Sequence, residues 1–171
     1  MFKYKKIWII GAVASGKSTL ARSLSENMCI SMYELDNLVH IRKSTGDIRR
    51  SDSERDEIFN RMMKSNSWII EGVYRDCFKS GLDYSDCILI MDTPSRVRKL
   101  RILIRWVKQI LKLEHSNYRP TLNMLRNMFR WSSSYDEDYN NFMVMLEPYK
   151  EKVMYYNHAS EKCQRGGYLF E

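Results

Sequence analysis

The sequence predicts an α/β fold in which a parallel sheet of five strands carries helices on both faces. Apolar, β-rich runs alternate with helical patterns along the 171 residues, which is the order of β-α-β units. Several of these runs are continuous rather than alternating, as expected for strands that are covered on both sides. A glycine-framed turn joins the first run to an amphipathic helix. Together these observations favour a parallel sheet over an antiparallel one.

The candidate strands are five apolar runs, at residues 6–10, 31–35, 68–70, 87–91 and 153–156. Helical patterns lie between them, at residues 17–28 and 53–64 and in a long stretch that begins at Pro94. In this long stretch the apolar residues recur at the spacing of one helix face: Val97, Leu100, Ile104, Val107 and Leu111. We expect a single domain over residues 1–171, with a helical, lid-like insert at about residues 114–135.

Length and composition exclude several classes of protein. The chain is long enough to bury a core without disulfides, and its 44% apolar and 29% charged content is ordinary for a globular protein. No apolar run approaches the roughly 18 residues of a membrane-spanning helix. The 4 cysteines lack C-x-x-C spacing, which indicates reduced thiols in a cytoplasmic protein rather than a zinc site or a disulfide framework.

Positive charge is concentrated in one stretch. The formal net charge is +7, and residues 96–112 contain basic side chains and no acid. The basic residues are Arg96, Arg98, Lys99, Arg101, Arg105, Lys108 and Lys112. On a helix, five of them at spacings of three and four form one stripe beside the apolar face: Arg98, Arg101, Arg105, Lys108 and Lys112. Such a cluster favours a local anionic ligand, a nucleotide or phosphoester, at least as strongly as it favours nucleic acid.

The turn after the first candidate strand has the spacing Gly11-x-x-x-x-Gly16-Lys17-Ser18 of a phosphate-binding loop. Glycines let backbone N–H groups converge on phosphate oxygens, the lysine places a positive charge between the outer phosphates, and the serine hydroxyl ligates Mg²⁺. The helix that opens at Lys17 adds its unpaired N–H groups and its positive end. The residues expected to bind ATP are Gly11, Ala14, Ser15, Gly16, Lys17, Ser18 and Thr19.

Three acidic residues each follow an apolar run: Asp36, Glu71 and Asp92. Ligands bind at the carboxyl ends of strands in open α/β sheets, so each acid is expected at the ligand-binding edge. Mg²⁺ held by Ser18 needs a carboxylate from a nearby strand end. The sequence leaves open which acid supplies it, and Glu71 and Asp92 are the preferred candidates.

Four motifs together resemble the adenylate-kinase-like P-loop proteins. They are GAVASGKSTLA, YELD, WIIEGVYR, and ILIMDTP followed by arginines. Within this group they are most similar to the small bacterial FlaR-like proteins, also called DNA topology modulation proteins. The resemblance covers about residues 5–157 and implies a three-layer, nucleotide-kinase-like P-loop NTPase fold.

The resemblance also implies roles for residues outside the loop. The segment from Glu71 to Arg75 is similar to the Asp-Gly-Phe-Pro-Arg element of adenylate kinases, in which the acid faces the Mg²⁺ site and the arginine grips the acceptor phosphate. This chain departs from that element twice, with Glu71 in place of aspartate and Tyr74 in place of proline. Arg101 and Arg105 resemble the paired arginines that flank the lid in those kinases.

The leading hypothesis is an ATP- and Mg²⁺-dependent phosphotransferase that acts on a small acceptor. Lys17 holds the outer phosphates, Arg101 and Arg105 neutralise charge in the transition state, and Arg75 anchors the acceptor. Asp36 matches an acid of the FlaR-like pattern at the acceptor side. If the acceptor is a hydroxyl, Asp36 is the candidate general base; if it is a phosphate, no base is needed and Asp36 is a recognition residue.

Two other functions stay open on the sequence alone. The basic helix suits a nucleotide-controlled DNA-binding protein, in line with the topology modulation label, although the chain has no recognisable DNA-binding motif. A simple ATPase, or a protein that binds nucleotides without transfer, also fits the loop. Arginines of the insert, Arg119, Arg126 and Arg130, are either lid residues that close over the phosphates or surface charge.

Overall fold

The computed structural model describes residues 3–43, 46–114, 120–157 and 162–164. The chain divides into two compact units. The first, here called the sheet unit, holds the described residues of Met1–Gly11, Gly16–Asp92 and Tyr149–Glu171. The second, here called the helical unit, holds the described residues of Ala12–Ser15 and Thr93–Pro148. The phosphate-loop segment of the sequence therefore leaves the sheet unit after Gly11 and returns to it at Gly16.

Five parallel strands form the centre of the sheet unit, in the order β2-β5-β1-β6-β7. Their bounds are Lys6–Ile10 for β1, Met32–Glu34 for β2, Trp68–Gly72 for β5, Cys87–Met91 for β6 and Val153–Asn157 for β7. The predicted α/β fold with five parallel strands is confirmed, and each predicted run contains the corresponding strand or overlaps it. The sheet also has a sixth strand that the sequence analysis missed, β8 (Lys162–Gln164), which pairs antiparallel to β7.

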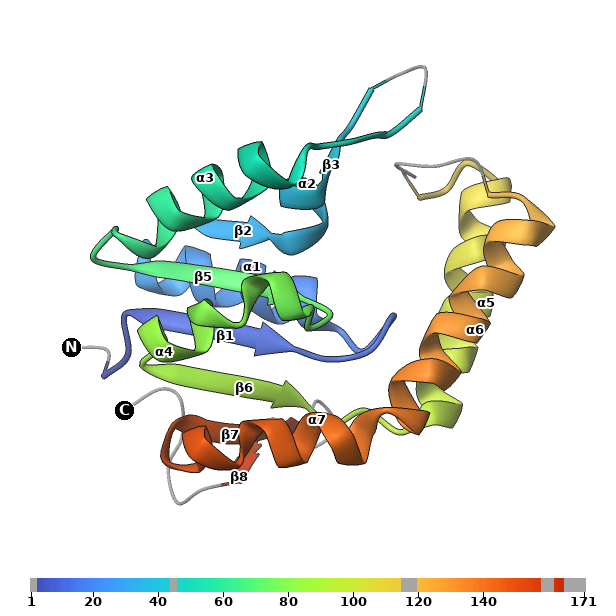
Figure 1. Cartoon of the computed structure of the whole chain (residues 1–171). Helices are drawn as coiled ribbons and strands as arrows, with labels where there is room; N and C mark the ends of the chain where they lie inside the picture. The colour runs from blue at the N-terminus through green and yellow to red at the C-terminus, as the bar shows by residue number, and fades with distance from the viewer. Residues whose placement is uncertain (1–2, 44–45, 115–119, 158–161, 165–171) are drawn as a thin grey trace. The chain divides into compact units, whose positions relative to one another are not determined.

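Helices of the sheet unit lie on both faces of the sheet (Figure 1). Their bounds are Lys17–Met28 for α1, Leu35–Val39 for α2, Asp52–Met63 for α3 and Ser80–Tyr84 for α4, with short 3-10 turns η1 at Asp76–Phe78 and η2 at Glu147–Lys152. A small hairpin of β3 (His40–Ile41) and β4 (Ile48–Arg49) connects α2 to α3. The predicted helix at 17–28 has the predicted bounds, and the one at 53–64 begins and ends one residue earlier.

Alternation along β1 shows why both faces are covered. Ile7 and Ile9 pack in one buried cluster with Leu20 of α1. Trp8 is also fully buried but points to the opposite face, as successive side chains of a strand do. There, a Cβ on Gly81 of α4 would lie 2.7 Å from the Trp8 ring and 2.9 Å from the ring of Phe59 in α3. These close approaches identify α3 and α4 as the second helical layer.

The helical unit consists of three helices, α5 (Ser95–Ile110), α6 (Leu122–Glu137) and α7 (Tyr139–Leu146). Thr121 caps α6, because its side-chain oxygen accepts a hydrogen bond from Met124 N at 3.2 Å. Trp106 of α5 donates its indole N–H to Thr121 O at 3.2 Å, which ties the two helices together. No helix in the described part of the chain is both long and apolar enough to cross a membrane.

The buried face of α5 differs from the face that its periodicity indicates. Its buried residues are Arg98, Ile102 and Gln109. The apolar stripe that predicted the helix is about half exposed, from 40% at Val97 to 60% at Leu111. Arg98 is buried because its guanidinium pairs with Asp136 of α6 and lies 5.8 Å from the centre of the Tyr135 ring. The interior of the α5–α6 pair is thus partly ionic, which apolar periodicity does not reveal.

Candidate functional site

The loop between β1 and α1 contains two residues in the left-handed region of φ. Ala14 and Gly16 both have positive φ, 60° and 100°. Gly16 permits this conformation without strain and lies directly before the first residue of α1. The N–H groups of Thr19 and Leu20 donate to Gly16 O at 3.1 Å, which starts the helix. The first turn of a helix presents N–H groups that have no carbonyl partner within that helix, together with its positive end.

Thr93 and Arg101 donate hydrogen bonds to backbone carbonyls of the loop. These carbonyls, of Ala14 and Ser15, belong to the helical unit as the two donors do. The Thr93 hydroxyl donates to Ser15 O at 2.9 Å. The Arg101 guanidinium donates to Ser15 O at 3.1 Å and approaches Ala14 O at 3.4 Å. Donors on these carbonyls fix the orientation of the peptide groups, so Arg101 positions the loop in this structure. Its predicted role in neutralising charge during transfer stays a prediction.

Ser18 and Glu71 come together although 53 residues separate them in sequence. The Ser18 hydroxyl donates to Glu71 Oε1 at 2.6 Å. Glu71 lies near the end of β5 and is held beside Ile9 of β1 by the strand register. Both Glu71 and Lys17 are largely buried, at 6% and 9% exposure. Of the two preferred acids, the structure therefore places Glu71 at the serine that was expected to ligate Mg²⁺.

The carboxylate of Glu71 is electrostatically tuned by its surroundings. Burial raises its pKa above the usual value for glutamate, and this cause outweighs the charge of Lys17 and the hydrogen bond from Ser18, which both lower it. The negative charges of Glu34 and Asp36 raise it further. Glu71 thus has the charges of Glu34, Asp36 and Lys17 around it, although the described residues contain no group of three His, Cys, Asp or Glu side chains that could hold a metal ion.

Asp36 and Arg75, the two residues predicted to contact the acceptor, form an ion pair. Arg75 donates through Nη2 to Asp36 Oδ1 at 2.6 Å, and both side chains are partly exposed, at 34% and 55%. The position of Asp36 follows from its neighbour. Leu35 packs so closely on Gly72 that a Cβ there would lie 2.8 Å from the Cβ of Leu35. Glycine after Glu71 therefore lets α2 approach β5 and brings Asp36 within reach of Arg75.

Sequence analysis missed Glu34, which ends β2. In the sheet Glu34 pairs with Glu71 in parallel register, so the two residues lie at the same edge. Its side chain accepts a hydrogen bond from Asn37 Nδ2 at 3.1 Å. The apolar run that predicted the strand extended through this position and treated Glu34 as part of it. Only the order of strands, with β2 next to β5, reveals the proximity.

The other predicted residues lie apart from these contacts or are occupied elsewhere. Asp92 is exposed and its backbone N–H donates to Tyr156 O at 2.9 Å, as part of the sheet. Arg105 is exposed and its guanidinium lies 3.5 Å from the carboxylate of Glu114. Arg126 and Arg130 are exposed on α6, and Arg119 lies outside the described residues. The roles predicted for these residues stay predictions.

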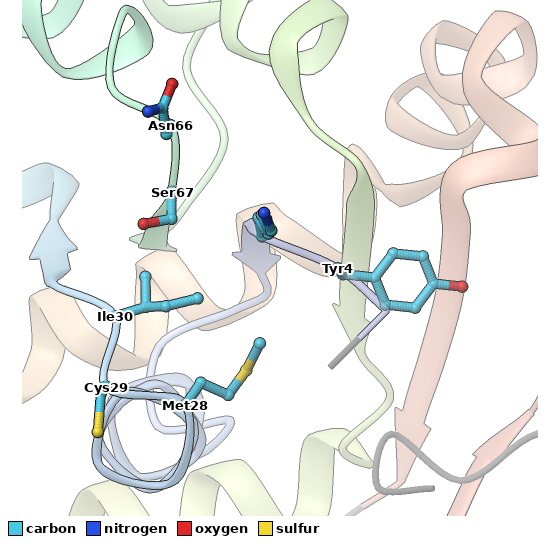
Figure 2. A pocket seen from close by; sticks show the side chains of 7 residues that line it. Tyr4, Met28, Cys29, Ile30, Asn66 and Ser67 are labelled. Atoms are coloured by element: carbon cyan, nitrogen blue, oxygen red, sulfur yellow. The ribbon is translucent and has the colours of Figure 1, made fainter. Parts of the chain in front are cut away.

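A separate pocket opens at the opposite edge of the sheet (Figure 2). It has a volume of about 310 Å³ and is lined by Tyr4, Lys5, Met28, Cys29, Ile30, Asn66 and Ser67. Tyr4, Ile30 and Ser67 precede β1, β2 and β5, so the pocket lies at the amino ends of these strands. Because the strands are parallel, this is the edge opposite to Glu71, and the pocket contains none of the predicted site residues.

Two solved structures are similar to this chain. The first is a shikimate kinase from Acinetobacter baumannii in complex with shikimate, with 13% identity, a TM-score of 0.49, and coverage of 98% of this chain and 88% of that one. The second is a shikimate kinase from Bacteroides thetaiotaomicron, with 12% identity, a TM-score of 0.47, and coverage of 90% and 86%. No family model and no curated protein matches the sequence. The fold assignment accordingly rests on the sheet order and on the loop between β1 and α1.

Proposed function

We propose that this protein is an ATP-dependent phosphotransferase that moves the γ-phosphoryl group of ATP to a small acceptor. The observation that carries the proposal is the hydrogen bond between Ser18 and Glu71, directly after a loop with the Gly11-x-x-x-x-Gly16-Lys17-Ser18 spacing and with Ala14 and Gly16 at positive φ. A buried carboxylate beside a serine hydroxyl and a lysine is the donor set that Mg²⁺ and a polyphosphate require. The cysteines of the chain lack C-x-x-C spacing, and the proposed reaction consumes ATP. Both features suit a protein of the cytoplasm.

Each residue of the sheet edge has a physical task in this proposal. The residues of the loop, from Gly11 to Thr19, present their N–H groups to the β- and γ-phosphates, and Lys17 adds a positive charge between them. Mg²⁺, held by Ser18 and Glu71, offsets negative charge on the phosphates. Asp92 remains a second candidate ligand. Arg101 keeps the loop in its binding conformation through the carbonyls of Ala14 and Ser15.

A DNA-binding role draws less support from the structure. The basic stripe of α5 would need its cations free for phosphates of the nucleic acid. Arg98 is buried against α6, Arg101 contacts the loop carbonyls, and Arg105 lies beside Glu114. These contacts engage three of the five cations of the stripe, whereas Lys108 and Lys112 are exposed. We therefore propose a small-molecule acceptor rather than nucleic acid as the second ligand.

The test is nucleotide binding followed by detection of transfer. Full-length protein is titrated with ATP in the presence and absence of Mg²⁺ by calorimetry, and its reaction with a panel of nucleosides, nucleotides and hydroxylated metabolites is followed by mass spectrometry. Lys17→Ala should weaken ATP binding by about 100-fold or more, because an unshielded polyphosphate loses its main counter-charge. Lys64→Ala, which removes an exposed lysine after α3, is the matched control. Equal ATP affinity in both variants would refute the proposal.

A further inference from the structure

We infer that the acceptor reacts through a hydroxyl group rather than a phosphate, and that Asp36 accepts the proton of that hydroxyl. This inference rests on the proposed function and narrows its substrate class. It also departs from the family resemblance, which implies that Arg75 grips an acceptor phosphate. The contacts of Arg75 and the charges around Asp36 carry the argument.

Arg75 is engaged by a carboxylate. Its Nη2 donates to Asp36 Oδ1 at 2.6 Å, and the two residues come from α2 and from the segment between β5 and η1. Gripping an acceptor phosphate would require Arg75 to leave this pair and would leave the Asp36 carboxylate beside the incoming anion. A hydroxyl acceptor requires no such exchange. Arg75 then orients Asp36 through Oδ1, and Oδ2 takes no part in that hydrogen bond.

Negative charge at this edge argues in the same direction. Glu34 lies opposite Glu71 in the parallel register of β2 and β5, and Asp36 follows two residues later in α2, so three acidic residues lie at the ends of these strands. A phosphate monoester carries about −1.5 to −2 charges near neutral pH. In the proposed function Lys17 and Mg²⁺ serve the phosphates of ATP, so a second phosphate beside Glu34 and Asp36 is unfavourable, because like charges at short range repel. A neutral hydroxyl avoids this repulsion and can hydrogen-bond to a carboxylate.

Arginines on the segment that follows Asp36 are also matched with acids. Arg42 pairs with Asp47 across the β3–β4 connection. Arg50 pairs with Glu54 in the first turns of α3. These side chains therefore bring little net positive charge to an acceptor phosphate. The acidic partners of Arg42 and Arg50 thus offset the charge of these two arginines on the segment that follows Asp36.

The reaction balances with these groups. The acceptor oxygen forms a bond to the γ-phosphorus while the bond from that phosphorus to the bridging oxygen of ADP breaks, and ADP leaves with the bonding electrons. The hydroxyl proton moves to the Asp36 carboxylate and from there to solvent. General-base catalysis of this kind contributes about 10²- to 10⁴-fold to rate. Arg75 is a positioning residue because it acts through Asp36.

The first experiment uses water as the smallest acceptor with an O–H group, because an assay of ATP hydrolysis does not require the natural acceptor to be known. ATP hydrolysis by the full-length protein with Mg²⁺ is compared with that of Asp36→Asn, at equal ATP occupancy fixed by calorimetry. We expect Asp36→Asn to lower hydrolysis by about 100-fold with ATP affinity unchanged. Glu57→Gln, which removes the acid of an exposed Arg61–Glu57 pair on α3, should keep the wild-type rate. An unchanged rate in Asp36→Asn would overturn the inference.

The second experiment separates the acceptor classes. Each nucleoside is paired with its own 5′-monophosphate, and polyols and hydroxy acids are included, with product linkage read by phosphorus NMR. Esters formed on hydroxyl groups support the inference, whereas a phosphoanhydride product overturns it and leaves the proposed function standing. Bound ATP with no transfer to water or to any acceptor overturns the proposed function, and this inference with it.

A double-mutant cycle tests the positioning role of Arg75. If Arg75 acts only through Asp36, Arg75→Met should lower hydrolysis less than Asp36→Asn, and the double variant should be no slower than Asp36→Asn alone. An arginine that only binds an acceptor phosphate would leave hydrolysis unchanged, because no acceptor phosphate is present, and one that merely stabilises the fold would give an additive loss. Either an unchanged rate in Arg75→Met or additive losses would therefore overturn the assignment of Arg75.

Discussion

The two units of this protein position their charged side chains in different ways. In the sheet unit, Glu71 and Asp36 sit at positions set by strand register and by the contact of Leu35 with Gly72. In the helical unit, Arg98 and Arg101 sit on one helix, yet one is buried against α6 and the other contacts loop carbonyls. The difference teaches that strand register determines the neighbours of a side chain at the sheet edge, whereas the neighbours of a side chain on α5 depend on the segment that packs against it.

The largest expected effect comes from the buried carboxylate of the sheet unit. Glu71→Gln keeps an oxygen that can accept the Ser18 hydroxyl but removes the negative charge that Mg²⁺ requires. We expect kcat/KM for MgATP to fall by about 10³-fold, or about 4 kcal/mol. Steady-state kinetics over a range of Mg²⁺ concentrations measures it. Rescue by excess Mg²⁺ to within about threefold would show that Glu71 is not required for transfer and would place the ligand elsewhere, with Asp92→Asn as the next variant.

Arg101 should give the largest effect in the helical unit. Arg101→Met removes a charged donor from Ser15 O and Ala14 O, and hydrogen bonds to charged groups contribute about 1.5–3 kcal/mol. ATP affinity should therefore fall by about 30-fold, measured by calorimetry. The matched control is Arg105→Met on the same helix, whose exposed pair with Glu114 predicts a change of less than about threefold. Equal losses in both variants would mean that the two arginines act together on bound nucleotide, as the resemblance implies.

Much of the sheet unit could be predicted because its signals are local. The run at residues 6–10, Gly16 at positive φ and the helix at 17–28 follow one another in sequence, and each depends on neighbours within a few residues. The proximity of Glu71 to Ser18 could be proposed from the rule that parallel strands end at one edge. Glu34 could not, because its neighbourhood depends on β2 lying next to β5.

Prediction was weaker in the helical unit for a physical reason. Periodicity identified α5 and its apolar stripe, but the buried residues of α5 are Arg98, Ile102 and Gln109. Burial of Arg98 needs Asp136 and Tyr135, which lie on a helix that the sequence analysis recognised only as fragments of an insert. The ion pair of buried Arg98 with exposed Asp136 is a property of two helices together, so the pattern of one helix does not contain it.

Gly72→Ala tests whether packing at the sheet edge positions Asp36. The added Cβ would lie 2.8 Å from the Cβ of Leu35, and overpacking of this kind costs about 1–3 kcal/mol of folding stability. Gly81→Ala is the matched control, because its Cβ meets the rings of Trp8 and Phe59 instead. Chemical denaturation should show both losses. At a temperature where both variants are folded, only Gly72→Ala should also lower the rate of transfer. Equal rates in the two variants would show that the contact of Leu35 with Gly72 does not position Asp36.

The smallest effect is expected in the pH dependence of stability. Burial holds the pKa of Glu71 above the ordinary value of a glutamate, about 4.5, so the folded state binds a proton at this site more readily than the unfolded state does. In metal-free protein, the unfavourable charge of Glu71 is present at neutral pH and is relieved as pH falls through the raised pKa towards 4.5. The wild type should therefore gain stability relative to Glu71→Gln over that interval, measured by urea denaturation in EDTA. A constant difference between the two proteins would show that Lys17 and Ser18 compensate the burial of Glu71 completely, and that the sheet edge is as well balanced as the ion pairs around it.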